Sequence, residues 1–164
     1  MRILVINGPN LNLLGLREPD IYGNTTYDEL VSMIQKHAHE KTVEVVCFQS
    51  NHEGAIVDAI QEARYPNTTG VPSVLPNPTD SGLSSSVFDA IIINPAAYTH
   101  TSVALLDVLK AVNLPTVEIH ISNPNTRESF RHISYVGEYA EKTIKGQGIL
   151  GYLVAIDYLI DTYG

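Results

Sequence analysis

The feature that most constrains the fold of this chain is a regular alternation between short apolar runs and longer amphipathic stretches. The apolar runs are nearly continuous in Val, Ile and other β-forming residues, which is typical of strands buried on both faces of a parallel sheet. They span residues 2–7, 42–49, 89–94 and 115–122. The stretches between them repeat their apolar residues with helical spacing. Helices are therefore expected over 26–41, 53–63 and 101–112, with a last one over 146–164.

This alternation predicts an α/β fold, a flavodoxin-like three-layer sandwich with a five-stranded parallel sheet between helices. The fifth strand is the least distinct, and 133–136 is its candidate. At 164 residues the chain is expected to form one domain, 1–164. A stretch rich in Pro, Gly and Ser, 65–86, breaks the alternation. It is interpreted as a loop insertion on the surface, with a lid or a subunit contact as the alternatives.

Composition excludes several kinds of partner. The formal net charge is -8 and no run of Lys and Arg is present, so binding to nucleic acid is not expected. No apolar stretch reaches the ~20 residues that span a membrane. The apolar start, MRILVING, is predicted to be a strand and not a signal peptide. We therefore expect a soluble cytoplasmic protein, with its single cysteine, Cys47, in the core.

Polar and titratable residues follow three of the four clear strands. In open α/β sheets, ligands bind beyond the carboxyl ends of the strands, so these residues are expected to share one rim. They are Asn7, Asn10, Asn12, Arg17 and Tyr22 after the first strand, Asn94, Tyr98, His100 and Ser102 after the third, and Ser122, Asn123, Arg127 and Arg131 after the fourth. Because the chain has only ten Lys and Arg, an anionic substrate would be held by a few well-placed cations.

Glu118 and His120 lie two residues apart in the fourth strand and therefore on one face of it. An inner strand is covered on both faces, so a carboxylate there must be paired. A Glu in this position can orient the imidazole and favour its protonated form. The pair therefore indicates a general acid.

Neither a metal nor an organic cofactor is predicted. No His-x-x-x-His helix and no Cys pair occurs, and the neighbours His52 and Glu53 do not make a metal site by themselves. Gly146, Gly148 and Gly151 match Gly-x-Gly-x-x-Gly, but neither a following strand nor an acidic residue about 20 positions on completes a dinucleotide site. These glycines are interpreted as permitting close helix packing.

Four long motifs, INGPNLNLLGLREPDIYG, FQSNHEGAIVDAI, NPAAYTHTSVALLD and VEIHISNPNTRESFRHISY, carry a likeness that extends over essentially the whole chain outside 65–86. They closely resemble the type II 3-dehydroquinate dehydratases. The resemblance implies dehydration of 3-dehydroquinate to 3-dehydroshikimate through an enolate, in the shikimate pathway of aromatic amino acid biosynthesis or in quinate breakdown. It also implies a flavodoxin-like fold, a homo-dodecamer built as a tetramer of trimers, and no metal or organic cofactor.

The resemblance further implies individual roles. Tyr22 would be the base, with Arg17 beside it on a mobile lid. His120 would donate a proton to the leaving hydroxyl with Glu118 as its partner, and Asn10 would hold a water that stabilises the enolate. The substrate-binding residues implied are Asn94, His100, Ile121, Ser122, Arg127 and Arg131, together with Asp107 from a neighbouring subunit.

Two other functions stay open at this point. A non-catalytic flavodoxin-like module would bind FMN or a nucleotide, and a flavin-bound preparation would be yellow. A catalytically inactive homologue would act as a scaffold, although every matched catalytic position is occupied. The sequence does not distinguish a biosynthetic from a catabolic role.

Overall fold

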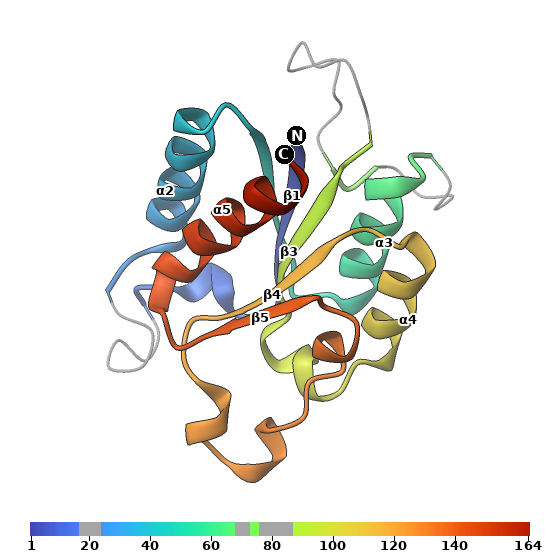
Figure 1. Ribbon diagram of the computed structural model, residues 1–164. Coiled ribbons are helices and arrows are strands. Elements are labelled where there is room, and N and C mark those ends of the chain that lie inside the picture. Colours follow the sequence, from blue (N-terminus) through green and yellow to red (C-terminus); the bar gives the residue numbers. More distant parts are fainter. Residues whose placement is uncertain (17–23, 68–72, 76–86) are drawn as a thin grey trace.

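The computed structural model describes residues 1–16, 24–67, 73–75 and 87–164 (Figure 1). Five parallel strands form one sheet in the order β2-β1-β3-β4-β5. The strands are β1 (Arg2–Asn7), β2 (Glu44–Gln49), β3 (Ala90–Asn94), β4 (Thr116–His120) and β5 (Lys142–Lys145). The helices are α2 (Tyr27–Glu40), α3 (Glu53–Arg64), α4 (Val103–Val112) and α5 (Gly151–Tyr163). This strand order is that of flavodoxin-like proteins, which confirms the predicted fold.

Helices cover both faces of the sheet, and each face has its own core (Figure 1). Along β1, Ile3 and Val5 pack into the core beneath α2 and α5, whereas Leu4 and Ile6 pack into the core beneath α3 and α4. All six residues of β1 are buried. Because successive strand side chains alternate between two covered faces, the four central residues of the strand are all apolar, which explains the continuous runs in the sequence.

Polar caps determine where two of the helices begin. At the start of α2, Thr26 and Glu29 form a capping box, in which each side chain bonds the backbone N–H of the other. At the start of α4, the Ser102 hydroxyl accepts a hydrogen bond from the Leu105 N–H at 3.0 Å. The second cap matters for the site, because it ends the loop that carries His100 and starts α4 at Val103.

The expectation of a fifth strand at 133–136 is wrong. Strand β5 lies at Lys142–Lys145 and pairs with β4, with Glu118 opposite Thr143 and His120 opposite Lys145. Only Ile144 is buried in β5, because an edge strand has lysines on its open side and so lacks a continuous apolar run. Val136, in the predicted range, is fully buried but lies in a short 3₁₀ turn.

The last helix starts later than predicted. Gly146 and Gly148 have φ values of 72° and 59°, which are left-handed and make the turn that leads into the helix. Helix α5 itself begins at Gly151, where an added Cβ would lie 3.3 Å from Ile144 Cγ2. The interpretation of close helix packing therefore fits Gly151, whereas the other two glycines serve the turn.

Part of the stretch 65–86 is described, at the end of the sheet where the strands begin. The buried Glu62 on α3 accepts hydrogen bonds from the Ser73 hydroxyl at 2.7 Å and from the Leu75 N–H at 3.3 Å. Leu75 is buried in the core beneath α3 and α4. The Phe88 N–H then bonds the Ala63 carbonyl at 2.8 Å, which returns the chain to the start of β3. None of the described helices is both long and apolar enough to cross a bilayer.

Candidate active site

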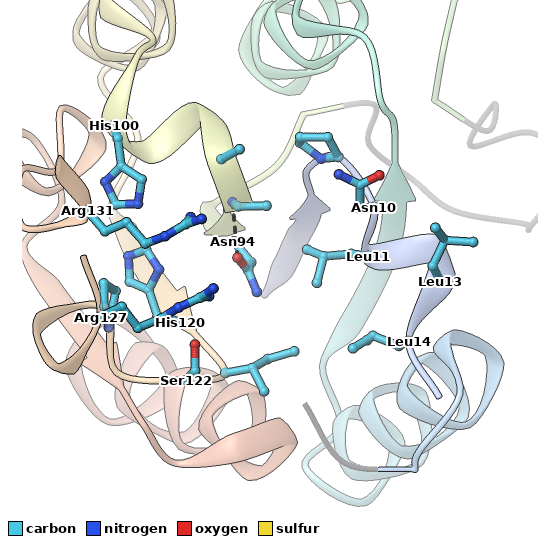
Figure 2. Close-up of a pocket in the computed structure, with 15 residues that line it drawn as sticks. Asn10, Leu11, Leu13, Leu14, Asn94, His100, His120, Ser122, Arg127 and Arg131 are labelled. Atoms are coloured by element: carbon cyan, nitrogen blue, oxygen red, sulfur yellow. Dashed lines mark hydrogen bonds between the residues drawn. The ribbon is translucent and has the colours of Figure 1, made fainter. Parts of the chain in front are cut away.

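A pocket lies beyond the carboxyl ends of β1, β3 and β4, at the rim that the sequence predicted. Its lining comes from three segments of the chain, 9–14, 94–100 and 120–131. Figure 2 shows His100, His120, Arg127 and Arg131 on one side, Leu11, Leu13 and Leu14 on the other, and Asn94 between them. The pocket therefore has a cationic, hydrogen-bonding wall facing an apolar one.

The structure brings most of the sequence-predicted residues to this pocket. The ones that line it are Asn10, Asn94, His100, His120, Ile121, Ser122, Arg127 and Arg131. Glu118 lies behind His120 and is fully buried. Asp107 lies on an exposed position of α4 and does not line the pocket of this chain. Arg17 and Tyr22 lie outside the described residues.

Glu118 is held against His120 by two hydroxyl groups. Its Oε1 lies 3.0 Å from His120 Nε2, an ion-pair distance, although the ring N–H lacks the alignment of a hydrogen bond. The Ser134 hydroxyl donates to Oε1 at 2.5 Å, and the Thr143 hydroxyl donates to Oε2 at 3.0 Å. Burial alone would raise the pKa of Glu118, but His120, Ser134 and Thr143 outweigh it and lower that pKa. The carboxylate therefore stays ionised beside the imidazole.

His100 has a defined tautomer. Its Nδ1 lies 2.7 Å from the Ile133 carbonyl oxygen, which can only accept, so Nδ1 carries the hydrogen. Burial lowers the pKa of His100, and the nearby His120 and Arg131 add to this effect, although the bond to Ile133 opposes it. The neutral ring then leaves Nε2 as an acceptor, which suits a substrate hydroxyl.

The two arginines share one carboxylate at the mouth of the pocket. Arg131 Nε donates to Glu128 Oε2 at 2.8 Å, and Arg127 Nε lies 3.8 Å from the same oxygen. Although the chain has a net charge of -8, no carboxylate is present among the described residues that line the pocket. The lining is therefore a local cationic region in an acidic protein, which favours a small anion.

The loop after β1 fits closely against the loop after β3. An added Cβ on Gly8 would lie only 2.5 Å from the Pro95 carbonyl oxygen, so no larger residue fits there without a backbone shift. Two residues further on, Asn10 has a left-handed backbone with φ of 67°. Its N–H donates to Asn51 Oδ1 at 2.9 Å. This scaffold places the Asn10 side chain in the pocket wall.

Sequence reasoning missed several contributors. Ser134 and Thr143, which hold Glu118, were not considered, and Thr143 was missed because the fifth strand was misplaced. With β5 in its true position, the parallel register sets Thr143 beside Glu118, and that signal could have found it. The apolar wall of Leu11, Leu13 and Leu14 has no signal beyond its place in the loop after β1.

Cys47 packs against the core beneath α2 and α5, as the sequence predicted. Burial raises the pKa of its thiol to about 12, so the thiolate needed for nucleophilic chemistry does not form near neutral pH. Within the described ranges, no group of three or more His, Cys, Asp and Glu side chains is placed to hold a metal ion.

The fold and the pocket define a flavodoxin-like α/β protein with a pocket lined by two arginines and backed by a buried Glu–His pair. Comparison with known proteins makes this specific. The chain belongs to the class II dehydroquinase family, because the family described as "Dehydroquinase class II" matches it over residues 1–160.

Relatives of known name agree with this assignment. The chain is 45% identical over 162 residues to "3-dehydroquinate dehydratase 1" of Corynebacterium efficiens, which covers 99% of this chain and 93% of the relative. It is 50% identical over 157 residues to the "Catabolic 3-dehydroquinase" of Podospora anserina, covering 96% and 92%. The crystal structure of a type II dehydroquinase from Butyrivibrio crossotus superposes with a TM-score of 0.83 at 49% identity, covering 98% and 97%.

Proposed function

We propose that this chain is a 3-dehydroquinate dehydratase, which converts 3-dehydroquinate to 3-dehydroshikimate by eliminating water through an enolate intermediate. The observation that carries the proposal is the ionised, buried Glu118 held against His120, which lines the same pocket as Arg127 and Arg131, in a chain of this family.

The reaction has two bond-breaking steps. A base first removes the proton next to the substrate ketone, and the electron pair of that C–H bond moves into an enolate. The enolate then re-forms the carbonyl and pushes out the β-hydroxyl, which takes a proton from His120 and leaves as water. Glu118 orients the His120 ring and stabilises the positive charge on it before the proton is transferred.

The remaining pocket residues bind the substrate. Arg131 and the backbone N–H groups of Ile121 and Ser122 hold the carboxylate, with Arg127 contributing positive charge. His100 accepts a hydrogen bond from a substrate hydroxyl through its free Nε2. When substrate binds, its carboxylate takes the place that Glu128 occupies on Arg131.

The base is Tyr22, and Arg17 lowers the cost of forming its phenolate, since a nearby guanidinium favours the charged form. Asn10, in the pocket wall, holds the water that stabilises the enolate oxygen. The family motif GLREPDIYG supports the roles of Arg17 and Tyr22, and the position of Asn10 in the pocket supports the third role.

At the level of assembly, we propose a cytoplasmic homo-dodecamer, a tetramer of trimers, in which Asp107 reaches into the site of a neighbouring subunit. The exposed position of Asp107 on α4, away from its own pocket, supports this role. Residues 1–164 form one catalytic domain, and 65–86 is an insertion at its surface. Its described residues lie at the end of the sheet opposite the pocket, which favours a surface or subunit-contact role over a lid.

Mixing the purified protein with 3-dehydroquinate tests the proposed activity. The product contains a conjugated enone, so its ultraviolet absorbance should grow with time and in proportion to protein concentration. If no absorbance develops at high protein concentration, the proposal is wrong. A yellow preparation would instead favour a flavin-binding protein.

A further inference from the structure

Behind the pocket wall, three side chains from three elements form a buried hydrogen-bonded chain. Asn7 ends β1, Asn94 ends β3 and Tyr152 lies in the first turn of α5. Asn7 and Tyr152 are fully buried, and Asn94 is 4% exposed. The Tyr152 hydroxyl lies 2.6 Å from Asn7 Oδ1 and 3.0 Å from Asn94 Nδ2. Of the three, only Asn94 reaches the pocket.

The direction of each hydrogen bond in this chain is fixed. The Ala96 N–H, which can only donate, lies 3.2 Å from Asn94 Oδ1, so that atom is the amide oxygen (Figure 2). The neighbouring Nδ2 must then donate to the Tyr152 hydroxyl, which is left to donate its own hydrogen to Asn7. The 2.6 Å distance to Asn7 suits an O–H to oxygen bond and is short for an amide donor.

One hydrogen of the Asn94 amide remains. Nδ2 carries two hydrogens and Tyr152 takes one, while no second acceptor in the described part of the chain bonds the other. We infer that Tyr152 is a positioning residue: it fixes the Asn94 amide so that the second Nδ2–H is presented to an oxygen of the bound substrate. The inference rests on the proposed function for the identity of that substrate.

Burial keeps the Tyr152 hydroxyl protonated and hydrogen-bonded to both asparagines. Burial raises the pKa of Tyr152, so its hydroxyl stays protonated and able to donate. Without the hydroxyl, Asn94 Nδ2 and Asn7 Oδ1 would both lose a buried partner. The Asn94 amide would then be free to turn, and it could present its oxygen to a substrate oxygen, which repels it.

Tyr152→Phe tests the inference, and Tyr139→Phe is its matched control. Tyr139 also donates a hydrogen bond from its hydroxyl, to the Leu114 carbonyl at 3.0 Å, but at the opposite end of the sheet from the pocket. We expect Tyr152→Phe to raise the KM for 3-dehydroquinate about tenfold, the effect of one misplaced hydrogen bond, with a much smaller change in kcat. Tyr139→Phe should leave both constants near the wild-type values.

A double-mutant cycle separates positioning from general destabilisation. If Tyr152 acts through Asn94, then adding Tyr152→Phe to Asn94→Ala should lower kcat/KM no further. An equal loss in both backgrounds, or an unchanged KM in Tyr152→Phe, would overturn the inference. Should Tyr152→Phe fail to fold, Asn7→Ala removes the acceptor that holds the same hydroxyl in its direction toward Asn94, so KM should rise, and an unchanged KM would overturn the inference. An inactive wild-type protein would refute the proposed function instead, so the two failures are distinguishable.

Discussion

At the scale of single residues, Glu118 illustrates what a buried charge requires. An ionised carboxylate without partners in a protein interior is strongly unfavourable. Here two hydroxyls and an imidazole surround it, and together they lower its pKa despite complete burial. Period-two alternation was enough to predict from sequence that Glu118 and His120 share a face. Ser134 comes from a loop, and no local pattern links it to Glu118, so only the folded structure identifies it.

Thr143→Val tests how Glu118 is held. Without the Thr143 hydroxyl, the pKa of Glu118 should rise. In the folded protein the pKa of Glu118 lies below its ordinary value of about 4.3. The ionised side chain therefore stabilises the fold at pH values above about 4.3, and this stabilisation is lost as the pH falls through the folded pKa. In Thr143→Val we expect the loss of stability to occur at a higher pH than in the wild type. The acidic limb of the pH profile of kcat/KM should move to higher pH as well.

Thr116→Val provides the control for this measurement. It removes a buried hydroxyl from the same strand as Glu118, one that donates to the Leu114 carbonyl at 2.9 Å and lies at the far end of β4. It should leave the acidic limb in place. If both variants shift the limb equally, or neither does, then Thr143 does not control the ionisation of Glu118.

At the scale of elements, the strands and helices that were predictable are those whose burial is uniform. β1 and β3 are buried along their whole length and have continuous apolar runs. β5 is an edge strand with one buried residue, Ile144, so its sequence resembles a polar loop. The position of the helix start after Gly148 likewise depended on left-handed backbone angles that a Gly-rich sequence permits but does not specify.

Gly8→Ala and Gly54→Ala form a pair that tests the close approach of the strand-end loops. The new methyl at Gly8 would meet the Pro95 carbonyl oxygen at 2.5 Å, so the loops that line the pocket must shift. We expect kcat/KM to fall by about 10² or more, since small misplacements of catalytic groups are costly. At Gly54, in α3, an added methyl meets nothing within 4 Å and should raise the free energy of unfolding by about 0.5–1 kcal/mol.

The test is to measure kinetic constants and denaturant unfolding curves for Gly8→Ala, Gly54→Ala and the wild type. Wild-type activity in Gly8→Ala would mean that the loop after β1 can move without cost. A loss of activity in Gly54→Ala would mean that α3 affects the site in a way that its contacts do not explain.

In the molecule as a whole, the pocket and the described part of the stretch 65–86 lie at opposite ends of one sheet. The pocket uses the carboxyl ends of the strands, whereas Glu62 fixes residues 73–75 near the amino ends. The sequence predicted the rim that carries the pocket, because this follows from the topology of a parallel sheet. It did not predict where the stretch 65–86 is anchored, since a single buried Glu in a helix gives no indication of its partner.

Glu62→Ala tests whether residues 73–75 affect stability without affecting the pocket. The change removes the acceptor of the Ser73 hydroxyl and of two backbone N–H groups, at Val74 and Leu75. We expect the free energy of unfolding to fall by about 1–3 kcal/mol, while kcat and KM stay at wild-type values. Calorimetry and steady-state kinetics on the same preparation provide the comparison. A stable variant with altered KM would instead indicate that the insertion acts on the pocket.

If His120, held by Glu118, is the acid that protonates the leaving hydroxyl, then the kcat of His120→Ala must fall. Steady-state conversion of 3-dehydroquinate by this variant and by the wild type, followed through the absorbance of the enone product, is the measurement. With circular dichroism confirming an intact fold, we predict that kcat falls by roughly 10² to 10⁴, the usual effect of losing a general acid. A folded His120→Ala protein with a wild-type kcat would contradict the claim and place the acid elsewhere in the pocket.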